Sequence, residues 1–282
     1  MPDMMRLSLL TLAVLTAFAG NSVLARLALA DGAIDPWSFT ALRLISGALM
    51  LLLLAGASRV LKHGSAAGAL WLLVYALLFS LAYIDLAAGT GALILFAAVQ
   101  VTMIAGGLKN GERISTVQAA GLLLAGAGLF VLMKPGLERP SISGAAMMTA
   151  AGIGWGLYSL RGKSAGDALG ATAGNFARAA LLIAPITLTA FAIGRPVVVT
   201  QGGVILAISS GVITSALGYA LWYYVLKNLR AITASASQLS VPLLAASGGM
   251  LFLSEPITAG FAVSALLVLA GLGLVILPAG ER

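Results

Sequence analysis

The stretch ERISTVQAAGLLLAGAGLFVL, residues 112–132, returns later in the chain as EPITAGFAVSALLVLAGLGLVIL, residues 255–277. Both copies begin with a glutamate and a short polar turn, and both continue as a long apolar run interrupted by glycine. Each run is close to the roughly 20 residues that an α-helix needs to cross a bilayer. The chain therefore contains a repeated unit that ends in a membrane-spanning helix.

The composition places the whole chain in a membrane. Hydrophobic residues make up 60% of the sequence and charged residues 9%, and the mean hydropathy is +1.05. A soluble domain usually carries about 25% charged residues. The absence of cysteine excludes disulfides and thiolate metal sites, and the single histidine, His63, lies in a basic loop. In a membrane protein the basic residues behind the net charge of +7 indicate the orientation of the loops between spans. They do not indicate nucleic-acid binding.

Ten apolar segments are expected to span the membrane, which makes this an all-α integral membrane protein. Their expected bounds are 6–29, 36–57, 68–87, 89–108, 115–133, 141–162, 170–193, 201–226, 231–252 and 257–278. The connections are short, so no soluble domain fits between them. Pro185 and Pro242 fall inside spans, where proline should kink or break the helix.

The amino-terminal segment has a second interpretation. Arg6, the following apolar run and the small residues Ala17 and Ala19 resemble a cleaved signal peptide. The apolar run continues through NSVLARLALA, residues 21–30. This continuation favours a retained first span.

The basic residues predict the orientation. If both termini are cytoplasmic, the cytoplasmic side holds Arg6, Arg59, Lys62, Lys109, Arg113, Arg161, Lys163, Lys227, Arg230 and Arg282. The outer side then holds only Lys134, Arg139 and Arg195. The positive-inside bias therefore favours a multi-pass protein of the bacterial inner membrane with both termini in the cytoplasm.

Further matches extend the repeat over the whole chain. One shift of the sequence places Arg26 on Arg161 and Arg43 on Arg178, and a slightly larger shift places Glu112 on Glu255. The predicted units are 1–140 and 141–282, with five spans each. Because five is odd, the second unit enters the membrane from the opposite side, which is the inverted-topology repeat of many secondary transporters.

Two stretches resemble a known family. They are FAGNSVLARLAL followed by DPWSFTALRLISGALML in the first half, and the run from Gly218 to Ile276 with Ala234, Ser235, Pro242 and Glu255 in the second. Over essentially the whole chain the sequence resembles the drug/metabolite transporter superfamily, in the branch built from two EamA-type units. Within it the pattern is most similar to the bacterial aromatic amino-acid exporters of the YddG type. Where the family pattern has a proline in span four, this sequence has Val99 or Gln100. A kink in span four that matches the one expected at Pro242 in span nine therefore has no support.

This resemblance implies a ten-helix bundle that alternates between inward and outward openings around a central cavity. Inverted repeats also favour a binding site near mid-depth at their interface. Tyr75, Phe79 and Tyr83 recur every four residues and share a helix face. The predicted substrate-binding residues are Phe18, Asn21, Phe79, Tyr83, Gln100, Trp155, Tyr158, Tyr219, Ser237 and Gln238. Such rings and neutral polar groups suit an amphipathic molecule, although the same residues could serve as helix packing or interhelical glue.

Arg43 and Arg178 lie inside apolar spans, each about two turns from a membrane surface. They could attract a substrate carboxylate, or they could satisfy helix carbonyls and snorkel to the interface. Their matching places in the two units favour a gating or structural role over direct substrate contact.

No aspartate or glutamate falls in the middle of a predicted span, so a proton relay through a central acid is not expected, with Asp85 as the one candidate. An intramembrane enzyme would need clustered catalytic groups, and a channel would need a charged ring or carbonyl filter. The sequence therefore predicts a carrier, without cofactor or metal, that exports aromatic and other neutral amino acids by alternating access. Its expected partners are the substrate and the lipid bilayer, with a monomer as a plausible state. The alternative is an exporter of another small metabolite or a drug.

Overall fold

Helix caps and turn residues divide the hydrophobic sequence into helices. The computed structural model describes residues 4–109, 115–133, 140–163, 166–228 and 237–276. Asp35 accepts hydrogen bonds from the backbone N–H groups of Trp37 and Ser38, at 3.1 and 2.9 Å, and so starts the second long helix. Ser115 and Gln118 form a reciprocal capping box at the start of another.

The described residues are almost entirely helical, and their only β pairing is an isolated bridge between Ile34 and Val199. The first half contains α1 (Met4–Leu29), α2 (Pro36–Ala55), α3 (Ala57–Lys62), α4 (Ala66–Ala82), α5 (Ala88–Lys109) and α6 (Thr116–Leu132). The second contains α7 (Ile142–Lys163), α8 (Ala168–Ala192), α9 (Gln201–Ser209), the π-helix η1 (Ser210–Leu217), α10 (Gly218–Asn228), α12 (Val241–Leu253) and α13 (Ala259–Ile276).

The composition of these helices fits a membrane. Five of the described helical segments are long and apolar enough to cross one by length and composition, and four more are shorter apolar helices. The outer surface exposes large apolar side chains such as Leu53, Leu123 and Leu181. An apolar surface of this extent needs lipid around it. The prediction of an all-α integral membrane protein is therefore confirmed.

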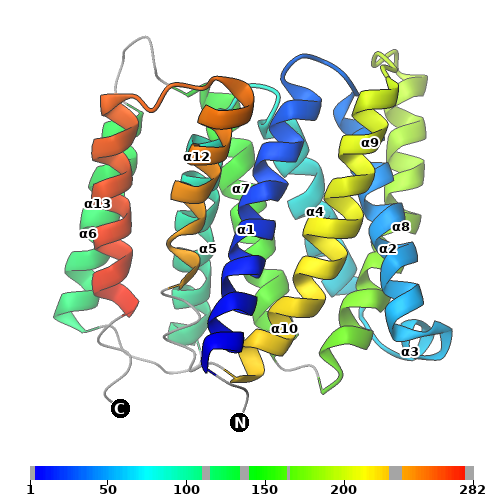
Figure 1. The fold of residues 1–282 in the computed structure, drawn as a ribbon, viewed down its shortest axis with the longest axis horizontal. Helices are drawn as coiled ribbons and strands as arrows, with labels where there is room; N and C mark the ends of the chain where they lie inside the picture. Colours follow the sequence, from blue (N-terminus) through cyan, green and yellow to red (C-terminus); the bar gives the residue numbers. More distant parts are fainter. Residues whose placement is uncertain (1–3, 110–114, 134–139, 164–165, 229–236, 277–282) are drawn as a thin grey trace.

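The long helices run alternately up and down, with α12, α1 and α10 in front of α5, α7 and α4 (Figure 1). The helix α1 starts at the lower edge of the view, whereas α7 starts at the upper edge, as an inverted repeat requires. The contacts follow the same symmetry. The helix α4 packs on α7 while α9 and α10 pack on α1, and α5 packs on α7 while α12 packs on α1. The division into two units at residue 140 stays a prediction.

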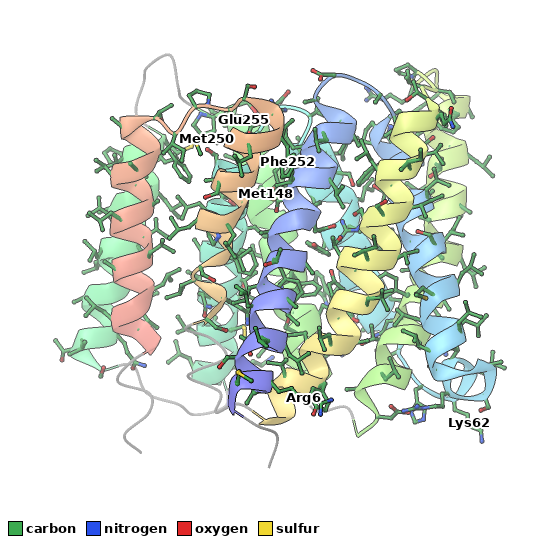
Figure 2. The ribbon with its side chains drawn as sticks, in the orientation of Figure 1. Arg6, Lys62, Met148, Met250, Phe252 and Glu255 are labelled. Carbon is green, nitrogen blue, oxygen red and sulfur yellow. The ribbon has the colours of Figure 1, made fainter. Side chains whose placement is uncertain are left out.

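Two ends of the bundle differ in charge. Arg6 and Lys62 lie at the lower edge, and Glu255 lies at the upper edge (Figure 2). We call the first the basic end, defined by Arg6, Arg59 and Lys62. We call the other the acidic end, defined by Asp31, Asp35, Asp85 and Glu255.

Several element predictions need correction. The short helix α3 and the π-helix η1 were not predicted. Of the predicted ninth span, residues 231–236 lie outside the described part of the chain. Its described residues turn at Leu239 and Ser240, and α12 begins at Val241 with Pro242 in its first turn. The helix is thus interrupted at Pro242, whereas α8 continues through Pro185. Predictions that involve Arg113, Lys134, Arg139, Arg230, Ala234, Ser235, Arg282 and the Glu112 match lie outside the described residues.

Candidate functional site

A group of aromatic rings from five helices meets in the middle of the bundle. Trp155 of α7 lies at its centre, with ring centroids 4.9 Å from Tyr75 of α4 and 4.8 Å from Tyr219 of α10. Phe18 of α1 packs edge-on against Trp155 at 6.4 Å and against Tyr219 at 6.0 Å. Phe176 of α8 adds a further edge contact to Tyr219, at 5.8 Å. Aromatic residues far apart in the sequence thus form one connected cluster.

A small cavity opens inside this cluster. Its lining residues are Phe18, Asn21, Ser22, Tyr75, Phe79, Leu95, Phe96, Trp155, Thr214 and Tyr219. Its free volume is about 20 Å³, which is room for one water molecule and not for an organic substrate. The structure therefore shows the cavity in a closed state.

Asn21 joins the two halves through hydrogen bonds beside the cavity. Its side-chain oxygen accepts from the hydroxyls of Ser210 and Thr214, at 2.7 and 3.1 Å. Its side-chain nitrogen donates to the hydroxyl of Tyr75 at 3.2 Å. Ser210 and Thr214 both belong to η1, and π-helical turns are frequent at functional sites. The network fixes three polar groups at the cavity wall.

At the acidic end an ion pair joins the two halves. Arg26 Nε lies 2.9 Å from Glu255 Oε1, with 19% and 15% of the two side chains exposed. Arg26 also donates to the carbonyls of Tyr83 and Ile84, and the second oxygen of Glu255 accepts from the N–H of Ala88 at 2.8 Å. We call this set of contacts the acidic-end latch.

At the basic end a second ion pair joins the two halves. Arg59 forms a two-point pair with Asp167, at 2.7 Å from Nε and 2.6 Å from Nη2. This hydrogen-bonded pair lowers the pKa of Asp167 to about 2, and the backbone N–H of Gly170 adds to the effect. Arg178 donates from Nη1 to the carbonyl of His63 at 2.8 Å. We call the Arg59–Asp167 pair the basic-end latch.

The predicted site residues fall into two groups. Phe18, Asn21, Phe79, Trp155 and Tyr219 come together around the cavity. The others do not line it: Tyr83 packs on Phe79 and donates to the carbonyl of Ala88, Tyr158 packs on Trp155, Gln100 is buried on α5, and Ser237 and Gln238 are half-buried before α12.

Several lining residues were not in the predicted set. Tyr75 and Phe96 share helix faces with predicted residues, at intervals of four, and that spacing could have identified them. Ser22 carries the same signal, four residues after Phe18, whereas Leu95 and Thr214 do not. Asp85, the candidate proton relay, is exposed at the acidic end, where its carboxylate accepts from Ser141.

Among the described residues, every carboxylate lies in a turn, a cap or a connection outside the middle of the bundle. Four lie at the acidic end and one, Asp167, lies at the basic end: Asp31, Asp35, Asp85, Asp167 and Glu255. Within the same residues, no cluster of three or more histidine or carboxylate side chains could hold a metal ion. The central cavity thus offers rings, hydroxyls and an amide.

An all-helical membrane bundle with a closed, aromatic cavity between its halves defines a protein of the small-molecule transporter class. Comparison with known proteins finds a match in the second half: the sequence model of the EamA-like transporter family matches residues 142–277.

Two relatives and one solved structure are similar to most of the chain. An uncharacterized protein of Pseudomonas aeruginosa is 48% identical over 281 residues, which cover 99% of this chain and 96% of that protein. An uncharacterized transporter of Archaeoglobus fulgidus is 25% identical over 72% of this chain and 73% of its own length. A crystal structure with 19% identity has the same fold, with a TM-score of 0.63 over 95% of this chain and 98% of that one.

Proposed function

We propose that this chain is an EamA-family transporter that exports aromatic and other neutral amino acids across the bacterial inner membrane, as the YddG-type exporters do. The observation that carries the proposal is the central cavity, where the rings of Phe18, Tyr75, Trp155 and Tyr219 surround the amide of Asn21. Rings supply area for an apolar side chain, and an amide with hydroxyls can orient the polar part of the cargo.

Alternating access is the mechanism that we propose for this cavity. The acidic-end latch joins Arg26 to Glu255, and the basic-end latch joins Arg59 to Asp167. Each latch links residues of the two predicted inverted units, 1–140 and 141–282. Opening one latch while the other stays closed would expose the cavity to one side only, so the closed cavity would be an intermediate between the two open states.

The orientation in this proposal has both termini in the cytoplasm, so that the basic end faces inward. Export then runs from the basic end to the acidic end. Since the described carboxylates lie at helix ends, we propose that flux follows the gradient of the cargo and not a central proton relay.

Uptake into proteoliposomes tests the function. The purified chain should move phenylalanine and threonine faster than lysine, and a pH gradient should leave the rates unchanged. Movement of a drug cation or of another metabolite, with no movement of any amino acid, would favour the alternative cargo within the same family.

Trp155→Ala tests the cavity. Trp155 contacts four other rings, so its removal should lower phenylalanine transport about tenfold or more, because a positioned contact surface is lost. Phe130→Ala is the matched control, since Phe130 is 70% exposed on the apolar surface of α6 and should transport like the wild type. Equal transport by both variants would contradict the role of Trp155.

A further inference from the structure

Arg43 is the largest fully buried side chain among the described residues, with 1% of its surface exposed. It is the eighth residue of α2, about 10 Å along the helix from the acidic end. Its Nε donates to the hydroxyl of Ser215 and its Nη2 to the hydroxyl of Tyr75, both at 3.1 Å. The guanidinium also lies 5.2 Å from the ring centre of Tyr75 and 5.0 Å from that of Phe79.

The charge of Arg43 is not neutralised by these contacts. Within the described part of the chain, no carboxylate forms an ion pair with Arg43, and its buried Nη1 atom has no hydrogen-bond acceptor. Neutral hydroxyls and aromatic faces compensate a buried cation only in part. Buried charges in proteins are normally paired, so this position lacks one anion.

Arg178, the matching arginine of the second half, is in a different situation. Its Nη1 donates to the carbonyl oxygens of His63 and Gly174, at 2.8 and 2.9 Å, and the side chain is half-buried. These contacts fit a structural role. The sequence suggested one shared role for the two arginines, whereas their contacts separate them.

The unpaired guanidinium lies directly behind the cavity wall. Tyr75 and Phe79 line the cavity with the same rings that cover Arg43. The hydroxyl of Tyr75 accepts from Arg43 on one side and from Asn21, a lining residue, on the other. A rotation of the Tyr75 ring during opening would therefore uncover the guanidinium to the cavity.

We propose that Arg43 is the anion anchor of the transport site, and that it binds a single carboxylate of the cargo together with the hydroxyl of Tyr75. The inference rests on the proposed transport function and narrows its substrate class to monocarboxylates with an apolar part. One guanidinium with one open nitrogen matches one carboxylate. No Arg, Lys or His of the described residues lines the cavity itself, so a cargo with several phosphates would lack partners beyond Arg43.

The test uses three probes that share a phenyl ring: L-phenylalanine, 3-phenylpropionate, which keeps the carboxylate, and phenethylamine, which keeps only the amine. Binding is measured as the ligand-induced rise in melting temperature of the purified full chain, independently of transport. Both carboxylates should stabilise the wild type, and phenethylamine should not. The apparent affinity for both carboxylates should fall about tenfold or more in Arg43→Gln.

Matched variants separate binding from folding. Arg178→Gln removes the pseudo-equivalent charge and should keep the ligand-induced shift, even if its own melting temperature falls. If Arg43→Gln does not fold, Tyr75→Phe takes its place, because it removes a hydroxyl of the proposed site and leaves the ring. Tyr75→Phe should also weaken carboxylate binding.

The outcomes distinguish the two proposals. Binding of 3-phenylpropionate that depends on Arg43, without transport of any amino acid, would support the anchor and contradict the proposed cargo. Transport of phenylalanine by the wild type, with unchanged carboxylate binding in Arg43→Gln or Tyr75→Phe, would overturn the anchor and leave the function intact. A wild type that responds to phenethylamine alone, or to none of the probes, would also overturn it.

Discussion

Single residues explain the closed state of the cavity. Asn21 satisfies two hydroxyls of η1 and the hydroxyl of Tyr75, and such interhelical hydrogen bonds contribute about 0.6 kcal/mol each in a membrane.

Burying an arginine at the centre of a membrane helix costs about 2.5–3.5 kcal/mol on insertion scales. The two hydrogen bonds from Arg43 to neutral hydroxyls offset only part of this free-energy cost. An anionic ligand beside Arg43 would offset more of it.

The charge state of Asp167 gives a prediction about pH. Its depressed pKa of about 2 means that the Arg59 pair stabilises the fold above the ordinary carboxyl pKa and loses this effect as the pH falls through about 2. Between pH 5 and pH 8 the carboxylate stays charged. Asp167→Asn should therefore lower the melting temperature by the same amount at pH 5 and at pH 8.

The comparison is made in a His63→Gln background, because the imidazole of His63 lies 3.6 Å from Asp167 and its removal leaves the Arg59 pair to be tested on its own. Melting curves of the two background variants at both pH values give the result. A destabilisation that disappears at pH 5 would show that Asp167 takes up a proton there and would contradict the lowered pKa.

For single residues, the sequence predicted which kinds of side chain meet in the bundle. It did not predict which way all of them face. Hydropathy gives the depth of a residue, and spacing gives its helix face, so Phe18, Asn21 and Trp155 could be found. The rotation of each helix depends on its neighbours, and for this reason Gln100 and Tyr158 lie at a similar depth without lining the cavity. The hydroxyls of Ser210 and Thr214 have no periodic signal at all.

Helices are the scale at which the sequence was most informative. Apolar length located the spans to within a few residues, because a membrane helix must satisfy all of its backbone groups internally. The π-helix η1 could not be predicted in this way, since its residues are as apolar as their neighbours and its register is set by contacts. There α2 and η1 approach closely at Gly211, where an added Cβ would meet the backbone of Arg43.

Close approach between α6 and α13 gives a prediction about stability. A Cβ at Gly271 would lie 2.5 Å from the backbone oxygen of Gly121 and from the backbone nitrogen of Ala125. Since neither atom can move aside alone, Gly271→Ala should separate the two helices and destabilise the protein by about 1–3 kcal/mol. A lower melting temperature of the purified variant would show this.

The control lies on the same helix. Gly273 has no heavy atom within 4 Å of an added Cβ, so Gly273→Ala should leave the melting temperature unchanged or raise it slightly, because alanine favours the helix. Equal melting temperatures for the Gly271 and Gly273 variants would contradict the close helix contact.

The whole molecule combines two helical halves with one closed cavity and a latch at each end. The helix directions (Figure 1) and the pairing of α4 with α7 and of α10 with α1 match two inverted units. A repeat can be read from sequence because both copies keep their end helices. The asymmetric contacts of Arg43 and Arg178 could not be read, since they depend on side chains from other helices.

Site-directed labelling of two loops tests the inverted arrangement most directly. The chain has no cysteine, so one cysteine can be introduced at a time in place of Asp31, between α1 and α2, or of Gly166, between α7 and α8. Both positions are exposed, and they are equivalent in the two predicted units. A membrane-impermeant maleimide should label Asp31→Cys only from outside intact cells and Gly166→Cys only in inverted membrane vesicles. Labelling of both cysteines from the same face would contradict the inverted halves, and with them the proposed carrier mechanism.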